Sequence, residues 1–577
     1  MASSATSRPR RTKRTRSLFE PPGIQEEHDL QRALQLSMEA DLVDPDVSED
    51  EKAEESHSDS EEEEVTNGDE MDEKHVEEGS DPGWNEVCSE FDLPRFESVH
   101  GASSTVRGSV DPIKFFDKFF TPQVWSHLVQ QTNLYAKQYL DAFIDEDWQE
   151  TNEEELKALV GMLIGMGICY LPRQRMYWED KWRVSMVAKV MSRNRYLKLM
   201  KYLHINDNDR APARGDPNYN VLYKIQPLLD MLGRNFRSEF VPGANIVLDE
   251  DMIPYKGRMV IKQYMKDKPI KWGYKVFKLC DAETAYVYRL QIYTGKQDRN
   301  VDGGLSYAVS MAMVEGLTGQ NRTLYCDNWY TGVKLFKDLR AKGTSACGTV
   351  RTNRKEFPSA VAQVKKLERG ESYSVQRDHM VASVWYDKRP VYLLSTAHNA
   401  TGPHTVRRHT GSGNYSLVPC PPALKAYTTH MGAVDRSDRL SRQYTISRKS
   451  KKWWKRMFFY LVDTSISNAF ILYDLHPGRH RLSMLQFRES LIEALCRSSA
   501  GQGDFRGPNR PPAGDGPGPG RYHNLSHWPK HREKKGDCAQ CSDRKHNRVR
   551  SNYVCERCKV ALCVAPCFKN YHVRRNG

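Results

Sequence analysis

The sequence predicts a mixed α/β protein in which a helical region is followed by a β-rich region and a small metal-binding domain. Apolar residues recur at intervals of three and four from residue 111 to about residue 204, which is the period of an amphipathic helix. From residue 245 the interval changes to two, the period of a β-strand. Six of the thirteen cysteines lie between Cys538 and Cys567, where metal binding explains them best.

The first 108 residues are expected to be disordered apart from one short helix. Residues 44–81 contain 19 acidic and 2 basic residues, a composition that cannot build a core. Because the whole chain still carries a net charge of +12, the remainder is strongly basic, which favours nucleic acid as a partner. A soluble protein with solvated Lys and Arg side chains fits the same charge.

The start of the chain is basic but lacks the apolar core of a signal peptide. No run approaches the roughly 18 apolar residues that a membrane-spanning helix needs. We therefore expect an intracellular protein that does not enter a membrane.

Residues 26–42 (EEHDLQRALQLSMEADL) resemble a ubiquitin-interacting motif. The small Ala33 would let the helix lie close to the apolar patch of ubiquitin, with Leu30 and Leu34 on either side. The alternative is a marginal amphipathic helix that folds only with another partner. Further along, Ser58 and Ser60 precede four glutamates, a setting that favours acid-directed kinases.

The remaining elements follow in order along the chain. Helices are expected over residues 112–140, 153–167 and 185–204, before a polar loop near residue 218. Strands are expected in ANIVLDEDMIPY, YKVFKLC, AYVYRLQIY and RTLYCDNWY, with a helix over residues 304–317 between the last two. Residues 371–425 contain short β-like pieces that we interpret as an insertion, and helices return from residue 431 to about 473. Twelve of the twenty residues from 501 to 520 are Gly or Pro, which indicates a linker.

Two aspartates come late in predicted buried strands: Asp249 follows an Ile-Val-Leu run and Asp327 follows Leu-Tyr-Cys. A buried carboxylate is costly unless it is paired or binds a cation. Asp435 and Asp438 lie three residues apart on a predicted helix, and therefore on one face. Carboxylates from two strands and a helix can converge on two Mg²⁺ ions, which activate an attacking oxygen and stabilise the leaving oxygen of a phosphoryl transfer.

The same acids could instead be turn formers or helix caps. Glu250 and Asp251 follow Asp249 directly, so the pattern leaves open which carboxylate faces inward.

Several segments, in the same order, resemble the piggyBac transposase family. They are GMGICYLP, MSRNRYLKLMKYLHINDN, LDEDMIPYKGR (248–258), KPIKWGYKV (268–276), LYCDNWYTG (324–332) and HMGAVDRSDRLSRQYTISRKSKKWW (430–454). The resemblance runs from about residue 111 to 476 and resumes in the cysteine-rich tail. It implies a ribonuclease-H-like catalytic core with an aspartate triad and a β-rich insertion before the third acid. Position by position, Asp249 and Asp327 match the first two acids, Asp435 the third, and Asp438 an accompanying fourth.

The resemblance also implies a nuclear enzyme that moves DNA by a cut-and-paste route. The steps are nicking at the element's ends, attack of the 3′-OH on the opposite strand at a TTAA flank, hairpin opening, and integration at a new TTAA. It implies two Mg²⁺ ions per active site and a homodimer that pairs the terminal inverted repeats of double-stranded DNA. The alternative is a domesticated host protein that keeps the fold and DNA binding but no longer moves DNA.

The resemblance and the composition together give a domain map. Residues 109–240 form a helical dimerisation and DNA-binding domain, 241–370 and 426–440 the catalytic core, and 371–425 the insertion. Residues 441–500 form a helical DNA-binding region, 501–530 the linker and 531–577 the zinc domain.

Residues 442–456 are basic and aromatic and contain no acid. Such cations can neutralise phosphates while an aromatic ring stacks on a base, although a solvated helix face with core tryptophans fits the same pattern. The resemblance places Trp453 near the target site and leaves Trp454 to the core. The predicted DNA contacts are Arg448, Lys449, Lys451, Lys452 and Trp453, together with Arg258, Lys275, Asn328 and Tyr330 in the other matching segments.

Seven residues that can bind metal lie close together in the tail: Cys538, Cys541, Cys555, Cys558, Cys563, Cys567 and His572. Paired CxxC motifs at this spacing indicate zinc, because each presents two thiolates to one ion. Four ligands hold one Zn²⁺, so two ions need an eighth ligand, and His546 is the best candidate, with an ordinary surface histidine as the alternative.

The tail resembles the cross-braced zinc domain of the family, which helps to recognise the terminal repeats. A RING-like ubiquitin-ligase domain is the alternative, and it would make the chain a zinc-based adaptor of the ubiquitin pathway.

Overall fold

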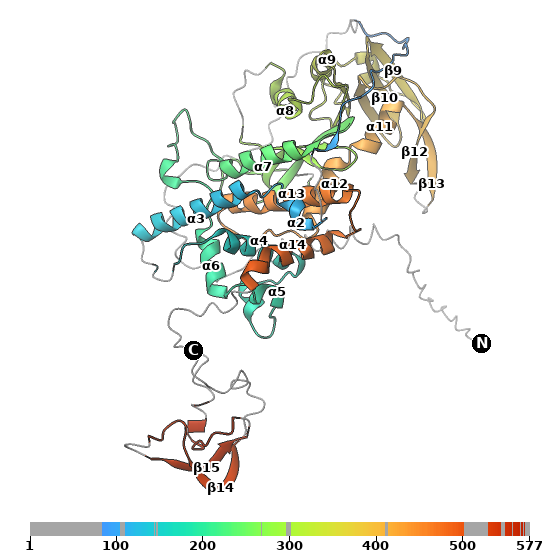
Figure 1. Ribbon diagram of the computed structural model, residues 1–577. Coiled ribbons are helices and arrows are strands. Elements are labelled where there is room, and N and C mark those ends of the chain that lie inside the picture. The colour runs from blue at the N-terminus through green and yellow to red at the C-terminus, as the bar shows by residue number, and fades with distance from the viewer. Residues whose placement is uncertain are drawn as a thin grey trace, which may run out of the picture. The chain divides into compact units, whose positions relative to one another are not determined.

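The computed structural model describes residues 83–500, apart from 104–109, 143–144, 146–147, 267, 296–301 and 410–413. It also describes residues 529–571, apart from 544–547, 557, 566 and 569–570. These residues belong to two compact units, Met1–Gly503 and Asp504–Gly577 (Figure 1). The predicted helix at residues 26–42, the acidic run and most of the linker lie outside the described residues. No described helix is long and apolar enough to cross a membrane.

The helical region is built from shorter helices than the periodicity predicts. The helix expected over residues 112–140 is divided into α2 (Pro112–Phe116) and α3 (Pro122–Ala142). Pro122 lacks a backbone N–H and therefore favours a helix start. The helix expected over 185–204 is divided in the same way, because Ser192 caps a new helix through the backbone N–H of Arg195. The remaining helices here are α4 (Glu153–Ile168), α5 (Ser185–Ala188), α6 (Arg193–Tyr202) and α7 (Gln226–Glu239).

A nine-stranded sheet forms the centre of the first unit, in the order β4–β5–β3–β7–β8–β11–β10–β9, with β6 also paired to β5. Strand β3 is parallel to β7, and β7 is parallel to β8, whereas β5 is antiparallel to β3. Helices α8 (Gly304–Val314) and α9 (Val333–Ala341) connect the parallel strands. The strands are β3 (Asn245–Pro254), β4 (Gln263–Tyr264), β5 (Trp272–Asp281), β6 (Val287–Ile292), β7 (Thr323–Cys326) and β8 (Ser345–Thr349).

The predicted insertion is largely continuous with this sheet. Strand β11 (Pro390–Ser395) pairs with β8, and β10 (Met380–Tyr386) and β9 (Ser372–Arg377) follow it outward. This pairing covers the edge of β8, whose backbone groups would otherwise be open to another chain. Strands β12 (His404–His409) and β13 (Tyr415–Cys420) form a separate two-stranded ribbon.

Residues 83–103 form an extended arm along the first unit, so the prediction of disorder up to residue 108 is wrong for this segment. At one end Asn85 pairs with Gln376 of β9 through two backbone hydrogen bonds of 2.8 and 2.9 Å. At the other end β1 (Gly101–Ala102) pairs with β2 (Phe240–Val241). In between, the buried guanidinium of Arg322 lies over the ring of Phe96, 5.0 Å from its centre.

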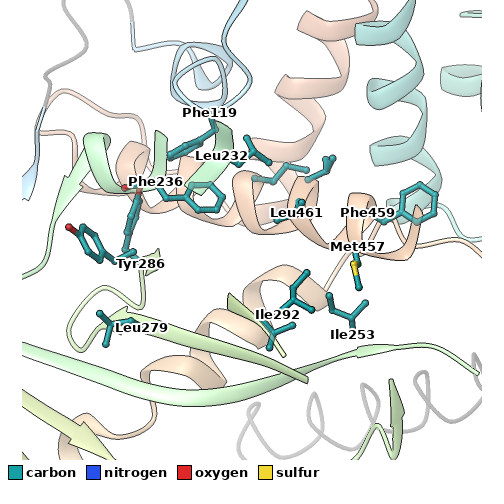
Figure 2. Packing of buried hydrophobic residues seen from close by; sticks show 14 of the residues in the cluster. Phe119, Leu232, Phe236, Ile253, Leu279, Tyr286, Ile292, Met457, Phe459 and Leu461 are labelled. Atoms are coloured by element: carbon teal, nitrogen blue, oxygen red, sulfur yellow. The ribbon is translucent and has the colours of Figure 1, made fainter. Parts of the chain in front are cut away.

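Three further helices complete the first unit: α12 (Ala433–Arg442), α13 (Trp453–Leu475) and α14 (Met484–Ala500), preceded by the shorter α11 (Pro422–His430). Helix α13 is buried along most of its length. Figure 2 shows its residues Met457 and Leu461 among side chains of β3, β6 and α7, including Ile253 and Phe236. This packing fixes α13 and the segment before it against the sheet.

The second unit is small and contains one described two-stranded sheet, formed by β14 (Pro529–Asp537) and β15 (Arg550–Cys555). Its core consists mainly of cysteines with Leu562. So little apolar surface cannot by itself stabilise a fold, which makes metal ligation the expected source of stability.

Candidate active site and zinc centre

Asp249 and Asp327 lie side by side because their strands are parallel and in register. Leu248 of β3 is the register partner of Cys326, the last residue of β7, and each aspartate is the next residue along. One oxygen from each of Asp249, Glu250 and Asp327 lies within 4.8 Å of the others. We call these three residues the acid cluster; an all-oxygen set of this kind suits Mg²⁺.

The acid cluster is electrostatically crowded. Burial, followed by the charge of Glu250, raises the pKa of Asp249 to about 8. The same two causes raise the pKa of Asp327. A bound divalent cation would relieve this repulsion, so the residues present fit a metal ion. Backbone N–H groups orient the two aspartates: Glu250 donates to Asp249 at 2.8 Å, and Trp329 to Asp327 at 2.9 Å.

Two lysines face the acid cluster. The Nζ of Lys268 lies 3.2 Å from the backbone oxygen of Glu250 and 3.4 Å from its carboxylate. Burial alone would lower the pKa of Lys268, but Glu250 and Asp249 outweigh burial and raise it. For Lys275 burial prevails and lowers the pKa, and its Nζ lies 4.3 Å from the ring centre of Trp329. The predicted DNA contact at Lys275 is therefore beside the acids.

The two acids of α12 have different environments, although the sequence places them on one helix face. Asp435 is exposed in the first turn and is one of the acids that raise the pKa of Lys268. Its carboxylate is not among the three oxygens that lie within 4.8 Å of one another. Asp438 is buried, with its Oδ1 2.6 Å from Lys278 Nζ. The structure thus joins Asp438 to a lysine of β5 and not to the acid cluster.

Asp438 belongs to a buried network of two acids and two bases: Asp251, Lys278, Asp438 and Arg442. Lys278 Nζ lies 2.8 Å from Asp251 Oδ2, and Arg442 pairs with both Asp251 and Asp438. Although burial alone would raise it, Arg442 and Lys278 hold the pKa of Asp251 well below its usual range. The network joins β3, β5 and α12, so it fixes the helix that carries Asp435 against the strand that carries Asp249.

In the second unit, Cys538, Cys541, Cys563 and Cys567 come together with their sulfurs within 4.8 Å of one another. Burial raises the pKa of Cys538, but backbone N–H donors, first that of Cys563 at 3.4 Å, outweigh it and lower the pKa to about 6. Four thiolates around one point are the ligand set of a structural Zn²⁺. The backbone N–H donors stabilise the thiolate form of Cys538, which is the form that binds Zn²⁺.

The other two cysteines form a second knuckle. Cys555 is buried, and its Sγ accepts a hydrogen bond from the backbone N–H of Cys558 at 3.4 Å. The predicted partners His546 and His572 lie outside the described residues. The first and third cysteine pairs along the chain therefore share one centre, as a cross-braced domain requires.

Known proteins match both units. The family model described as Transposase IS4 matches residues 111–470, and the model described as DDE_Tnp_1-like zinc finger matches residues 520–573. Human PiggyBac transposable element-derived protein 5 is 26% identical over 72% of this chain and 80% of its own length. Human PiggyBac transposable element-derived protein 2 is 28% identical over 81% of this chain and 77% of its own length. The chain belongs to the piggyBac-like transposase family.

A solved structure confirms the fold of this piggyBac-like chain. The chain of a piggyBac transposase synaptic complex with hairpin DNA aligns with a TM-score of 0.63 at 23% identity, covering 81% of this chain and 98% of that one. The strand order β6–β5–β3–β7–β8, with β7 and β8 parallel to β3, is the ribonuclease-H-like arrangement that the resemblance implied. The predicted α/β fold class and the C-terminal zinc domain are both confirmed.

The DNA contacts predicted for this piggyBac-like protein fall into two groups. Arg258, Asn328, Lys449 and Lys451 are exposed, and Lys452 and Trp453 are half-buried. Tyr330 and Arg448 are only 1% and 6% exposed, which corrects their prediction as direct contacts. The hydroxyl of Tyr330 lies 3.5 Å from Glu250, and Arg448 donates to the hydroxyl of Tyr177 at 3.3 Å.

The part of the basic stretch that contains Arg448 is not helical, in contrast to the prediction of helices from residue 431 to about 473. Residues 443–452 form a loop between α12 and α13, and the hydroxyl of Tyr255 donates to the Lys451 carbonyl at 2.9 Å. Loop residues can turn inward singly, which a helical period does not predict. Trp454 lies in the core, as predicted.

Glu250 and Lys268 are the site residues that sequence reasoning missed as partners of Asp249 and Asp327. The sequence shows Glu250 only as one of three consecutive acids. Its place in the acid cluster depends on where β7 ends beside β3, which no local pattern shows.

Proposed function

We propose that this chain is a DNA transposase that cuts and joins DNA by metal-dependent phosphoryl transfer at the acid cluster. The observation that carries the proposal is the meeting of Asp249, Glu250 and Asp327 where the parallel pairing of β3 with β7 ends, in a chain of this family. Carboxylates that converge on one point are typical of sites that hold divalent cations, and burial raises the pKa of two of these three, Asp249 and Asp327.

The residues around the cluster suit this chemistry. Asp249 and Asp327 would hold two Mg²⁺ ions together with Asp435, which stands exposed on α12. When bound, Mg²⁺ supplies activation of the attacking oxygen and stabilisation of the leaving oxygen. Lys268 and Lys275 place positive charge beside the position of the scissile phosphate. The hydroxyl of Tyr330 lies 3.5 Å from the carboxylate of Glu250, at the side of the acid cluster.

The substrate we propose is double-stranded DNA that carries the terminal inverted repeats of an element, with TTAA as the target. The piggyBac synaptic complex named above contains hairpin DNA. By extension, we propose that this chain acts in the nucleus as a homodimer that brings two element ends together. The zinc unit, completed by His546 and His572, would contribute to recognition of the repeats.

Substitution of the acids tests the proposal. Asp249→Asn, Asp327→Asn and Asp435→Asn in the purified full chain should each abolish strand cleavage in Mg²⁺ while DNA binding persists. Glu493→Gln removes an exposed acid of α14 and is the matched control, with cleavage expected to be unchanged. Cleavage by Asp435→Asn would remove that residue from the triad. A wild-type chain that binds terminal-repeat DNA but never cuts it would favour the domesticated alternative.

A further inference from the structure

The segment between β3 and β5 is basic and leads back to the acid cluster. Between residues 256 and 271 it contains six basic residues, Lys256, Arg258, Lys262, Lys266, Lys268 and Lys271, and a single acid. Four of the six, at positions 256, 258, 266 and 271, are exposed. Lys268 is the exception that points inward, with its amine on Glu250. Cations at this density beside a site for phosphoryl transfer fit a DNA backbone.

Two large aromatic side chains of the same segment stay exposed. Tyr264 of β4 and Trp272 of β5 are register partners, so both side chains leave the hairpin on one face. Their ring centres are 4.8 Å apart at an angle of 46°, and the rings are 37% and 44% exposed. The Nζ of Lys262 lies 4.9 Å from the ring centre of Trp272. We call Tyr264, Trp272 and Lys262 the aromatic platform.

A short turn links the aromatic platform to the acid cluster, because this turn carries Lys268, which contacts Glu250. The backbone N–H of Met265 donates to the Lys271 carbonyl at 2.8 Å, which closes the turn that carries Lys268. The backbone N–H of Tyr255, which follows β3, donates to the Trp272 carbonyl at 3.1 Å. The turn is thus fixed at both ends, to Glu250 and to the end of β3.

We propose that the aromatic platform stacks on an unpaired base of the DNA strand whose backbone lies at the acid cluster. The flat face of a base becomes available to an aromatic side chain only when the base leaves the duplex stack. Stacking tolerates any base, and the neighbouring cations hold the phosphates on either side. The platform would therefore stabilise opened DNA on the strand that leads to the acid cluster. This assignment rests on the proposed function and adds a ligand class, an extruded nucleobase, to that site.

The test compares two DNAs and a matched pair of tryptophans in the full-length chain, without added divalent metal. One DNA is fully paired, and the other has the same sequence with four unpaired bases, one of them the fluorescent 2-aminopurine. Trp272→Ala should weaken binding of the opened DNA by about tenfold and remove the quenching of the probe, because one stacked base is lost. Affinity for the paired duplex should stay within about twofold, since phosphate contacts carry it. Trp272→Phe should restore quenching.

Trp182→Ala is the control, because Trp182 is also exposed, at 47%, and carries Lys181 at 5.1 Å over its ring, but lies outside the sheet. Equal effects of Trp182→Ala and Trp272→Ala would overturn the proposal. So would a Trp272→Ala variant that weakens paired and opened DNA alike, or a wild type that leaves the probe unquenched. Because no strand is cut, failure of the transposase assignment would show separately, as loss of cleavage in Mg²⁺ with quenching intact.

Discussion

Lys278 lies in the middle of an apolar strand and is 0% exposed, between Asp251 and Asp438. Burying a charged group is costly unless each charge has a partner of opposite sign. With Arg442 the network contains two negative and two positive groups, and the hydroxyl of Tyr460 adds a hydrogen bond of 2.8 Å to Asp251. The balance predicts how substitutions combine.

Lys278→Met should destabilise the chain by about 3–5 kcal/mol, because it leaves two buried carboxylates with one cation. The double variant Lys278→Met/Asp438→Asn should recover part of that loss, since Asp251 and Arg442 then remain as a neutral pair. Urea unfolding of the wild type, Lys278→Met and the double variant measures the difference. A loss below about 1 kcal/mol for Lys278→Met would show that the network does not fix α12.

His204 gives a pH dependence that can be tested. It is 2% exposed, stacked on Tyr135 at 4.0 Å, and its Nε2 lies 2.9 Å from Asn208 Oδ1. Burial lowers its pKa to about 3. The folded state therefore holds this ring neutral, and its stabilising effect is complete above the unfolded pKa of about 6.5 and is lost as pH falls toward 3.

Lowering the pH from 7 to 5 should therefore reduce the free energy of unfolding by about 2 kcal/mol through this residue. His204→Phe should lack that component while it keeps the ring stack. Urea unfolding at pH 7, 6 and 5 measures the two slopes. Equal slopes in the wild type and the variant would mean that His204 is protonated in the folded chain.

At the level of single residues, the sequence predicts the aspartates better than their partners. Asp249 and Asp327 each follow an apolar run, where a buried carboxylate is costly unless it is paired or binds a cation. Tyr330 and Arg448 could not be assigned to the interior, because their partners Glu250 and Tyr177 are distant in sequence. Lys278 did leave a signal, because it stands between Phe277 and Leu279 in a predicted buried strand, where a charge needs an acid as its partner.

At the level of the elements, strands β7 and β8 lie so close together that only glycine fits at position 348. A Cβ on Gly348 would lie 2.5 Å from the carbonyl oxygen of Cys326 and would also meet Thr331 Oγ1. Cys326 directly precedes Asp327, so a displaced carbonyl would move the second acid.

Gly348→Ala should consequently reduce strand cleavage by tenfold or more while DNA binding is retained, because an error of about 1 Å in the position of a catalytic group has effects of this size. Gly332→Ala is the control. Gly332 is close to Asp327 in sequence, but nothing lies within 4 Å of the position that its Cβ would take. The measurement is cleavage of labelled DNA in Mg²⁺. Equal activity of the two variants would mean that β8 does not position Asp327.

The sequence predicts a strand or helix where apolar residues recur with a regular period. It does not predict pairing between elements that are distant in sequence. The four predicted strands of the core are all present, since their period is two and their flanks are polar. The breaks before α3 and α6 depend on a proline and a serine cap inside an otherwise helical pattern. The pairing of β11 with β8 could not be predicted, because register between distant strands leaves no local pattern.

For the whole molecule, the two units differ in what stabilises them. The first has an extensive apolar core, whereas the second has a core of cysteines. Chelation of zinc should therefore unfold the second unit and leave the first folded. Native mass spectrometry of the full chain should find two zinc ions. Cys563→Ser should lose the ion of the four-cysteine centre, and His546→Ala the other. A single zinc in the wild type would exclude His546 as a ligand.

The extended arm has a consequence for the order of folding during synthesis. Tyr373 of β9 donates to Glu86 at 2.8 Å across 287 residues of sequence. The arm leaves the ribosome long before its partner strand β9 is synthesised, because synthesis proceeds at about 5–20 residues per second. For tens of seconds this end of the arm lacks its partner strand β9, and closing so long a loop is slow compared with local contacts. Asn85 and Glu86 are thus synthesised early but are among the last residues to reach their native contacts, after β9 has been added to the sheet.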